Sequence, residues 1–102
     1  MYLYYATKYV YEYHGGWSFP FPYQKDEIYC VLSNHSVARY HDTQNCDSFS
    51  CERGEIERLI CELKESTDRE EEGIPVEDLI CFFQNCIEET DPNNSDVFFV
   101  WM

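Results

Sequence analysis

The chain has few basic residues. Lys and Arg together number 7, against 20 Asp and Glu, which leaves a formal net charge of −13 at pH 7. Such an excess is repelled by the phosphates of nucleic acid and by anionic membrane surfaces, and it is attracted to basic surfaces. The sequence therefore argues against direct binding to nucleic acid or membrane, and it predicts a basic protein partner.

Long apolar runs, phosphate-binding loops and a secretion signal are also missing. No apolar stretch approaches the roughly 20 residues that a membrane helix needs. Residues 1–10 are rich in tyrosine and lack the basic start and apolar run of a signal peptide. The four glycines match no phosphate-binding fingerprint. We expect a cytoplasmic protein whose six cysteines are free thiols, because disulfides are rare in that compartment.

Aromatic residues, in contrast, are abundant and make up 18% of the 102 residues. Tyr, Phe and Trp bury large apolar areas, so the chain can form a core despite its charge. Its length is that of one common domain. We therefore predict a single domain over residues 1–102.

The N-terminal half has the alternation of apolar and polar positions that is typical of strands. Strands are expected over residues 2–13, 27–32 and 36–41. Gly15 and Gly16 signal a turn. Residues 17–23 contain two prolines that remove backbone donors, which indicates an edge segment or an ordered aromatic loop. Residues 42–50 are expected to be a polar connector.

The C-terminal half has the periodicity of helices. An apolar stripe at helical spacing predicts a helix over residues 52–64, with Ser50 as its N-cap. The stripe consists of Ile56, Leu59, Ile60 and Leu63. A second helix is predicted over residues 75–89, because Pro75 suits the first helical position and an apolar stripe follows it.

The remaining segments complete the fold prediction. Residues 65–73 form an acidic linker without an apolar residue. Residues 96–102 are expected to be a strand, and the continuous apolarity of residues 97–101 indicates that it is central. The element order is then β-β-β-α-α-β. Two helices between strands predict an α+β fold, in which a mostly antiparallel sheet is covered on one face by a helical hairpin.

Four residues have side chains that could bind a metal ion. His35, His41, Cys46 and Cys51 fall within seventeen residues. Their spacings, His-x5-His and Cys-x4-Cys, are at the wide limit for zinc ligands. Cys51 is also disfavoured as a nucleophile, because its neighbours Asp47 and Glu52 would raise the pKa of the thiol. We predict no metal, cofactor or catalytic residue, and a small Cys/His metal-dependent enzyme remains an alternative.

The acidic residues gather in the C-terminal half. Residues 52–102 hold 15 of the 20 acids but only four of the seven Lys and Arg residues. A merely solvated face would not need this clustering, which costs stability through self-repulsion. A protein surface that imitates duplex nucleic acid would need clustered charges, because the duplex carries about one charge per 1.7 Å of its axis. The residues expected to bind a partner are Glu62, Glu65, Asp68, Glu70, Glu71, Glu72, Glu77, Asp78, Trp17 and Phe19.

Aromatic residues would supply the apolar part of such an interface. Trp17 and Phe19, together with Phe21 and Tyr23, could act as desolvated anchors. In the alternative interpretation, these four side chains cover the sheet edge or the helices.

A short, acidic α+β chain with a run such as Asp68-Arg69-Glu70-Glu71-Glu72 resembles phage-encoded anti-defence proteins. These include anti-CRISPR and anti-restriction inhibitors, several of which mimic DNA. The resemblance implies a stoichiometric inhibitor that occupies a basic nucleic-acid channel. Acidic immunity proteins and antitoxins that block nucleases are similar to this chain in the same respects.

The leading hypothesis is therefore a non-enzymatic inhibitor, monomeric or homodimeric, that binds the basic nucleic-acid-binding surface of a defence effector. It would act in the host cytosol if its source is viral. One alternative is an immunity protein or antitoxin for a nuclease. Another is a structural subunit that docks through residues 97–102.

Overall fold

The structure is a computed structural model, in which residues 2–10, 13–17, 21–41 and 47–102 are described, residues 7–10 and 13–17 for their backbone alone. Five strands form one sheet in the order β2-β1-β7-β4-β3, and all neighbours are antiparallel. The strands are β1 (Leu3–Val10), β2 (Tyr13–Trp17), β3 (Tyr40–His41), β4 (Ser48–Glu52) and β7 (Asp96–Trp101). The predicted terminal strand lies at the centre of the sheet, as its apolarity indicated.

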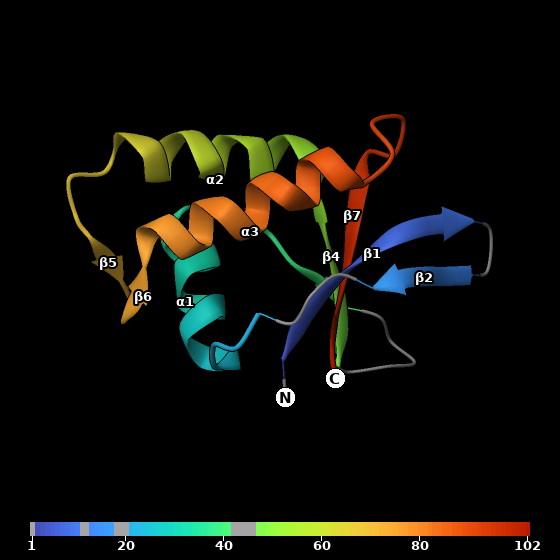
Figure 1. Ribbon diagram of the computed structural model, residues 1–102, viewed down its shortest axis with the longest axis horizontal. Coiled ribbons are helices and arrows are strands. Elements are labelled where there is room, and N and C mark those ends of the chain that lie inside the picture. Colours follow the sequence, from blue (N-terminus) through green and yellow to red (C-terminus); the bar gives the residue numbers. More distant parts are fainter. Residues whose placement is uncertain (1, 11–12, 18–20, 42–46) are drawn as a thin grey trace.

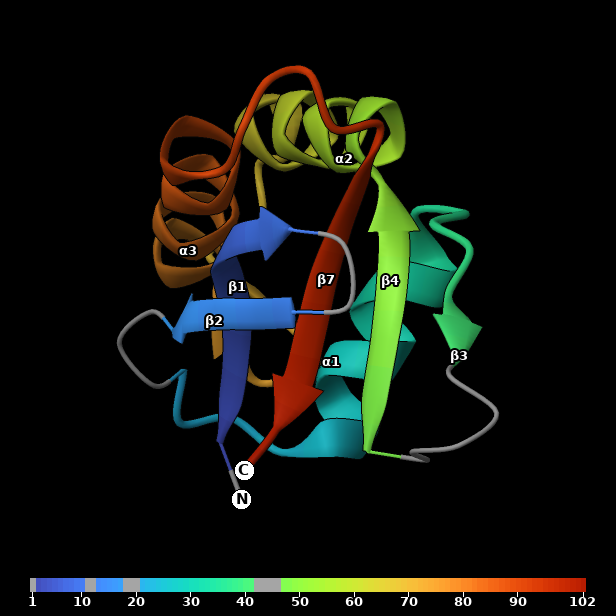
Figure 2. The ribbon, with the colours of Figure 1, turned by 90° about the vertical axis from the view of Figure 1, so that its right-hand side faces the viewer.

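Three helices cover one face of this sheet. They are α1 (Lys25–Asn34), α2 (Arg53–Glu65) and α3 (Val76–Glu89). In Figure 2 the sheet lies in front with all three helices behind it, and β2 crosses in front of β1, on the side away from the helices. Helices α2 and α3 lie side by side and are joined through the short strands β5 (Glu70–Glu71) and β6 (Ile74–Pro75) (Figure 1). The predicted α+β class, the antiparallel sheet and its helical cover are confirmed, but the predicted element order β-β-β-α-α-β is wrong, because α1 lies between β2 and β3 and two short strands separate α2 from α3.

The predicted strand over residues 27–32 is wrong, because this segment belongs to helix α1. Its alternation of Ile28, Cys30 and Leu32 suggested a strand, but Cys30 is exposed. The residues that α1 buries are Ile28, Val31 and Leu32, which have the i, i+3, i+4 spacing of a helix. Asp26 lies in the first turn, where a negative charge favours the helix dipole.

Three smaller predictions about strands and turns also need correction. The predicted strand over residues 36–41 is reduced to β3, whereas the supposed connector contains most of β4. In β4, Phe49 and Cys51 are buried under the helices, and the polar serines alternate with them. Gly15 and Gly16 lie within β2 rather than in a turn.

The two predicted helices are confirmed within a residue or two at their ends. Helix α2 has Glu52 at its N-cap rather than Ser50, and no side chain caps it. Pro75 is the N-cap of α3 and also the last residue of β6. The predicted acidic linker over residues 65–73 contains strand β5 and the turn that joins it to β6, so the linker has secondary structure.

The core lies between the sheet and the helices and is rich in aromatic rings. Phe49 and Phe99 stack at 5.1 Å between ring centroids, and Phe83 of α3 meets Phe99 edge-on. A second stack joins Phe21 to Phe82 at 4.3 Å. The two chain ends pair, since Tyr2 and Met102 exchange two backbone hydrogen bonds.

Candidate functional site

The predicted acidic residues lie together at one end of the molecule. The chain measures 41 × 27 × 23 Å, and its longest axis ends where α2 finishes, the β5–β6 hairpin turns and α3 begins, at the left of Figure 1. We call this region the acidic end. Its carboxylates are those of Glu62, Glu65, Asp68, Glu70, Glu71, Glu72, Glu77 and Asp78. Within residues 62–78 these eight acids face only two cations, those of Lys64 and Arg69.

The hairpin that carries the middle of the acidic end is well defined. Glu71 pairs with Ile74, which leaves Glu72 and Gly73 as a two-residue turn. Both turn residues have positive φ, 53° and 78°, as a type I′ turn requires. Ile74 is fully buried and fixes the hairpin to the core. The carboxylates on the hairpin therefore lie on an ordered turn rather than on a solvated linker.

Four carboxylates of the acidic end have no partner among the described residues. They are those of Glu65, Asp68, Glu70 and Glu77, and all four residues are exposed. The other four accept hydrogen bonds from within the protein. Asp78 accepts one from the Tyr23 hydroxyl at 2.6 Å, and Glu72 accepts one from the Asn34 amide at 3.1 Å.

Glu62 and Glu71 hold opposite sides of the same imidazole. Nδ1 of His35 lies 3.1 Å from Glu62, and Nε2 lies 2.8 Å from Glu71. The His35 side chain is only 14% exposed. Its burial lowers the pKa of the imidazole, but the hydrogen bonds to Glu71 and Glu62 outweigh burial and raise it. His35 was considered as a metal ligand from the sequence, and the structure places it between carboxylates instead.

Arg53 is the most extensively bound cation among the described residues. Its guanidinium donates to the backbone oxygens of Asn94, Ile87 and Asp91 and to the hydroxyl of Thr90, at 2.7 to 3.2 Å. Arg53 therefore connects α2 to the end of α3 and to the loop before β7, and its guanidinium is bound by acceptors within the protein.

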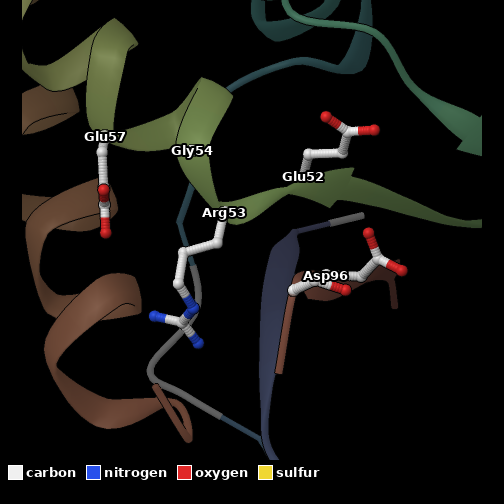
Figure 3. Close-up of a pocket in the computed structure, with 6 residues that line it drawn as sticks. Glu52, Arg53, Gly54, Glu57 and Asp96 are labelled. Atoms are coloured by element: carbon white, nitrogen blue, oxygen red, sulfur yellow. The ribbon is translucent and has the colours of Figure 1, made fainter. Parts of the chain in front are cut away.

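Arg53 also lines an acidic cavity of about 460 Å³. Glu52, Glu57 and Asp96 contribute carboxylates to the lining, and Figure 3 shows the Arg53 side chain turned away from Glu52. The same region contains the exposed Tyr40. The negative charge of Glu52 is the main cause that raises the pKa of the Tyr40 phenol. Both observations indicate an excess of negative charge near the N-terminus of α2.

The aromatic residues proposed as anchors have different positions. Phe19 and the side chain of Trp17 lie outside the described residues; the Trp17 backbone pairs with Ala6. Phe21 is buried in its stack with Phe82, so it covers the helices rather than serving as an anchor. The large apolar residues that are exposed in the described part of the chain are Tyr2, Tyr40 and Met102.

Among the described residues, the cysteines and histidines considered from the sequence do not form a metal site. Cys51 is fully buried, and burial raises the pKa of its thiol to about 12, which opposes a reactive thiolate. Cys46 lies outside the described residues, and the other five cysteines are unpaired thiols. Within residues 2–10, 13–17, 21–41 and 47–102, no three His, Cys, Asp or Glu side chains are grouped to hold a metal ion.

None of the helices in the described ranges is both long enough and apolar enough to span a membrane. Comparison with protein-family models, with curated proteins and with solved structures finds no match to this chain.

Proposed function

We propose that this protein is a non-enzymatic inhibitor that binds the basic nucleic-acid-binding surface of a host defence effector, of the anti-CRISPR or anti-restriction type. The observation that supports the proposal is the acidic end, where the chain from the end of α2 through the ordered β5–β6 hairpin to the start of α3 carries eight carboxylates, against two Lys and Arg residues within residues 62–78. The inhibitor would act in the cytosol of the host, where such effectors bind nucleic acid.

Charge would act first on the rate of association. A patch of one sign steers an oppositely charged surface toward it, and this steering weakens as salt screens the field over about 10 Å at 0.1 M. The unpaired carboxylates of Glu65, Asp68, Glu70 and Glu77 are free to accept hydrogen bonds from the partner's Arg and Lys side chains. Because the hairpin is already ordered, little conformational entropy is lost on binding.

The internal cations support the same interpretation. Arg53 is bound to the end of α3, Arg39 lies 3.8 Å over the ring of Tyr29, and Lys25 pairs with Asp47. These positive charges are held away from the acidic end. Arg58 and His35 do contact the acidic end, through Glu62 and Glu71. The carboxylates of Glu65, Asp68, Glu70 and Glu77 stay available for a cation supplied by another molecule.

Two matched double variants test the proposal. Glu65→Lys with Glu77→Lys reverses one charge on α2 and one on α3 at the acidic end. Glu57→Lys with Glu88→Lys makes the same change on the same helices, at their opposite ends. All four residues are exposed, and none of their side chains is a hydrogen-bond partner of Arg53, so we expect both variants to fold.

The measurement is inhibition of a panel of purified CRISPR effectors, restriction nucleases and secreted nuclease toxins, with association rates at several salt concentrations. We expect the acidic-end pair to weaken inhibition at least about tenfold, mainly through slower association, and the control pair to have a much smaller effect. The protein should also compete with nucleic acid for its target. Equal inhibition by both variants would rule out the acidic end as the contact. Inhibition of a secreted nuclease toxin alone would favour an immunity protein.

A further inference from the structure

His35 joins three elements at one point. It is the C-cap residue of α1, its Nδ1 faces Glu62 of α2, and its Nε2 faces Glu71 of β5. The preceding residue, Asn34, donates its side-chain amide to Glu72 in the hairpin turn. The end of α1 is thus tied to the acidic hairpin by two adjacent side chains.

The protonation state of the His35 imidazole determines how many of its hydrogen bonds to Glu62 and Glu71 can form. An ionised carboxylate only accepts hydrogen bonds, whereas a neutral imidazole has one N–H donor and one acceptor nitrogen. His35 can therefore donate to both Glu62 and Glu71 only as the imidazolium ion. In the neutral ring, one nitrogen lone pair would face a carboxylate oxygen, and that contact would be repulsive.

The charges around His35 favour the imidazolium form on balance. From the hairpin, Glu71 contacts the ring directly, and Glu72 lies one residue further along. From α2, the carboxylate of Glu62 contacts the ring, while the positive charge of Arg58 disfavours protonation of His35. Arg58 pairs with Glu62 at 3.2 Å and donates to the His35 carbonyl oxygen at 2.8 Å. Helix α1 has no basic residue in its last turn, so its negative end also favours a cation here.

We propose that His35 is a pH-sensitive clasp, which as the imidazolium ion fastens the β5–β6 hairpin to the ends of α1 and α2, and which loosens the hairpin when it loses its proton. Ile74 keeps the hairpin attached to the core in both states. The clasp depends only on contacts within the chain, so it does not require the acidic end to bind a partner.

The sign of the pH dependence follows from the direction of the shift. The pKa of His35 is raised in the folded protein above its ordinary value of about 6.5. The stabilisation is therefore fully present below about pH 6.5 and is lost as the pH rises through the raised pKa. Lower pH closes the clasp, and higher pH opens it.

An NMR titration of the free protein tests the clasp. The imidazole signals of His35 should titrate with a midpoint above about 6.5, and the amide signals of Glu71, Glu72 and Gly73 should shift with the same midpoint. Glu71→Gln should lower that midpoint because it removes one carboxylate. Glu70→Gln is the matched control, since it removes the same charge from the neighbouring exposed residue, and it should leave the midpoint nearly unchanged.

A second measurement uses stability. The melting temperature of the parent should exceed that of His35→Gln by a margin that shrinks as the pH rises from about 5.5 to about 8.5. A His35 midpoint at or below about 6.5 in the parent would overturn the proposal. Equal midpoints in the Glu71→Gln and Glu70→Gln variants would do the same, as would hairpin signals that do not follow the ring. Since no partner is added, none of these results bears on the proposed inhibitor function.

Discussion

At the residue scale, two non-glycine residues with described backbones hold positive φ, namely Ser36 at 57° and Glu72 at 53°. Ser36 follows the C-cap of α1, where the amide of Val37 donates to Leu32 and that of Ser36 to Ser33. This is the hydrogen-bond pattern of a Schellman motif, which glycine usually completes. Ser36 therefore carries backbone strain that a glycine would not.

We predict that Ser36→Gly stabilises the protein by about 0.5–1 kcal/mol, because glycine occupies the left-handed region without steric cost. Ser33→Gly is the matched control, since Ser33 is exposed inside α1, and it should destabilise the protein by a similar amount. Urea denaturation of the three proteins measures both effects. Equal destabilisation by both substitutions would show that the turn at Ser36 is not strained.

Residue contacts at the acidic end could not be predicted from the sequence. Glu62, Glu71 and Asp78 were expected to bind a partner protein, but they contact His35 and Tyr23 within the chain, in segments predicted as strand or loop. A side chain's partner depends on which elements pack together, and a single mistaken element removes that information. The charge of the acidic end itself was predictable, because it lies within one short stretch of sequence.

At the scale of elements, the sequence was most informative where apolar residues are periodic over many positions. The stripe from Ile56 to Leu63 identified α2, and the apolar run of residues 97–101 identified the central strand β7. Helix α1 is short, and Ile28, Cys30 and Leu32 satisfy strand alternation as well as Ile28, Val31 and Leu32 satisfy helical spacing. Periodicity alone cannot decide so short a segment.

Arg53 provides the clearest test of how the elements are joined. Its guanidinium reaches four acceptors around the end of α3, and a lysine ammonium cannot reproduce that planar fork. We predict that Arg53→Lys lowers the free energy of unfolding by about 2 kcal/mol, because buried acceptors such as Thr90 lose their donor. Arg69→Lys, at an exposed position, should change it by less than about 0.5 kcal/mol. Thermal or urea unfolding of both variants measures the difference, and a tolerated Arg53→Lys would mean that charge alone matters there.

At the scale of the whole molecule, the distribution of charge has two opposite consequences for salt. A net charge of −13 on a chain of 102 residues repels itself, and this repulsion destabilises the folded state. The same charge attracts a basic partner. Dissolved salt screens both effects over similar distances.

We therefore predict that the free protein becomes more stable as NaCl rises from about 0.01 M to about 0.5 M at neutral pH, because screening relieves self-repulsion. Melting temperatures across that range measure the effect. The Glu65→Lys, Glu77→Lys double variant has four fewer units of negative charge, so its melting temperature should rise less with salt. The proposed complex should respond in the opposite direction and weaken as salt rises, which separates attraction between molecules from repulsion within one. A free protein that loses stability in salt would instead show that internal ion pairs, such as Lys25 with Asp47, outweigh the self-repulsion.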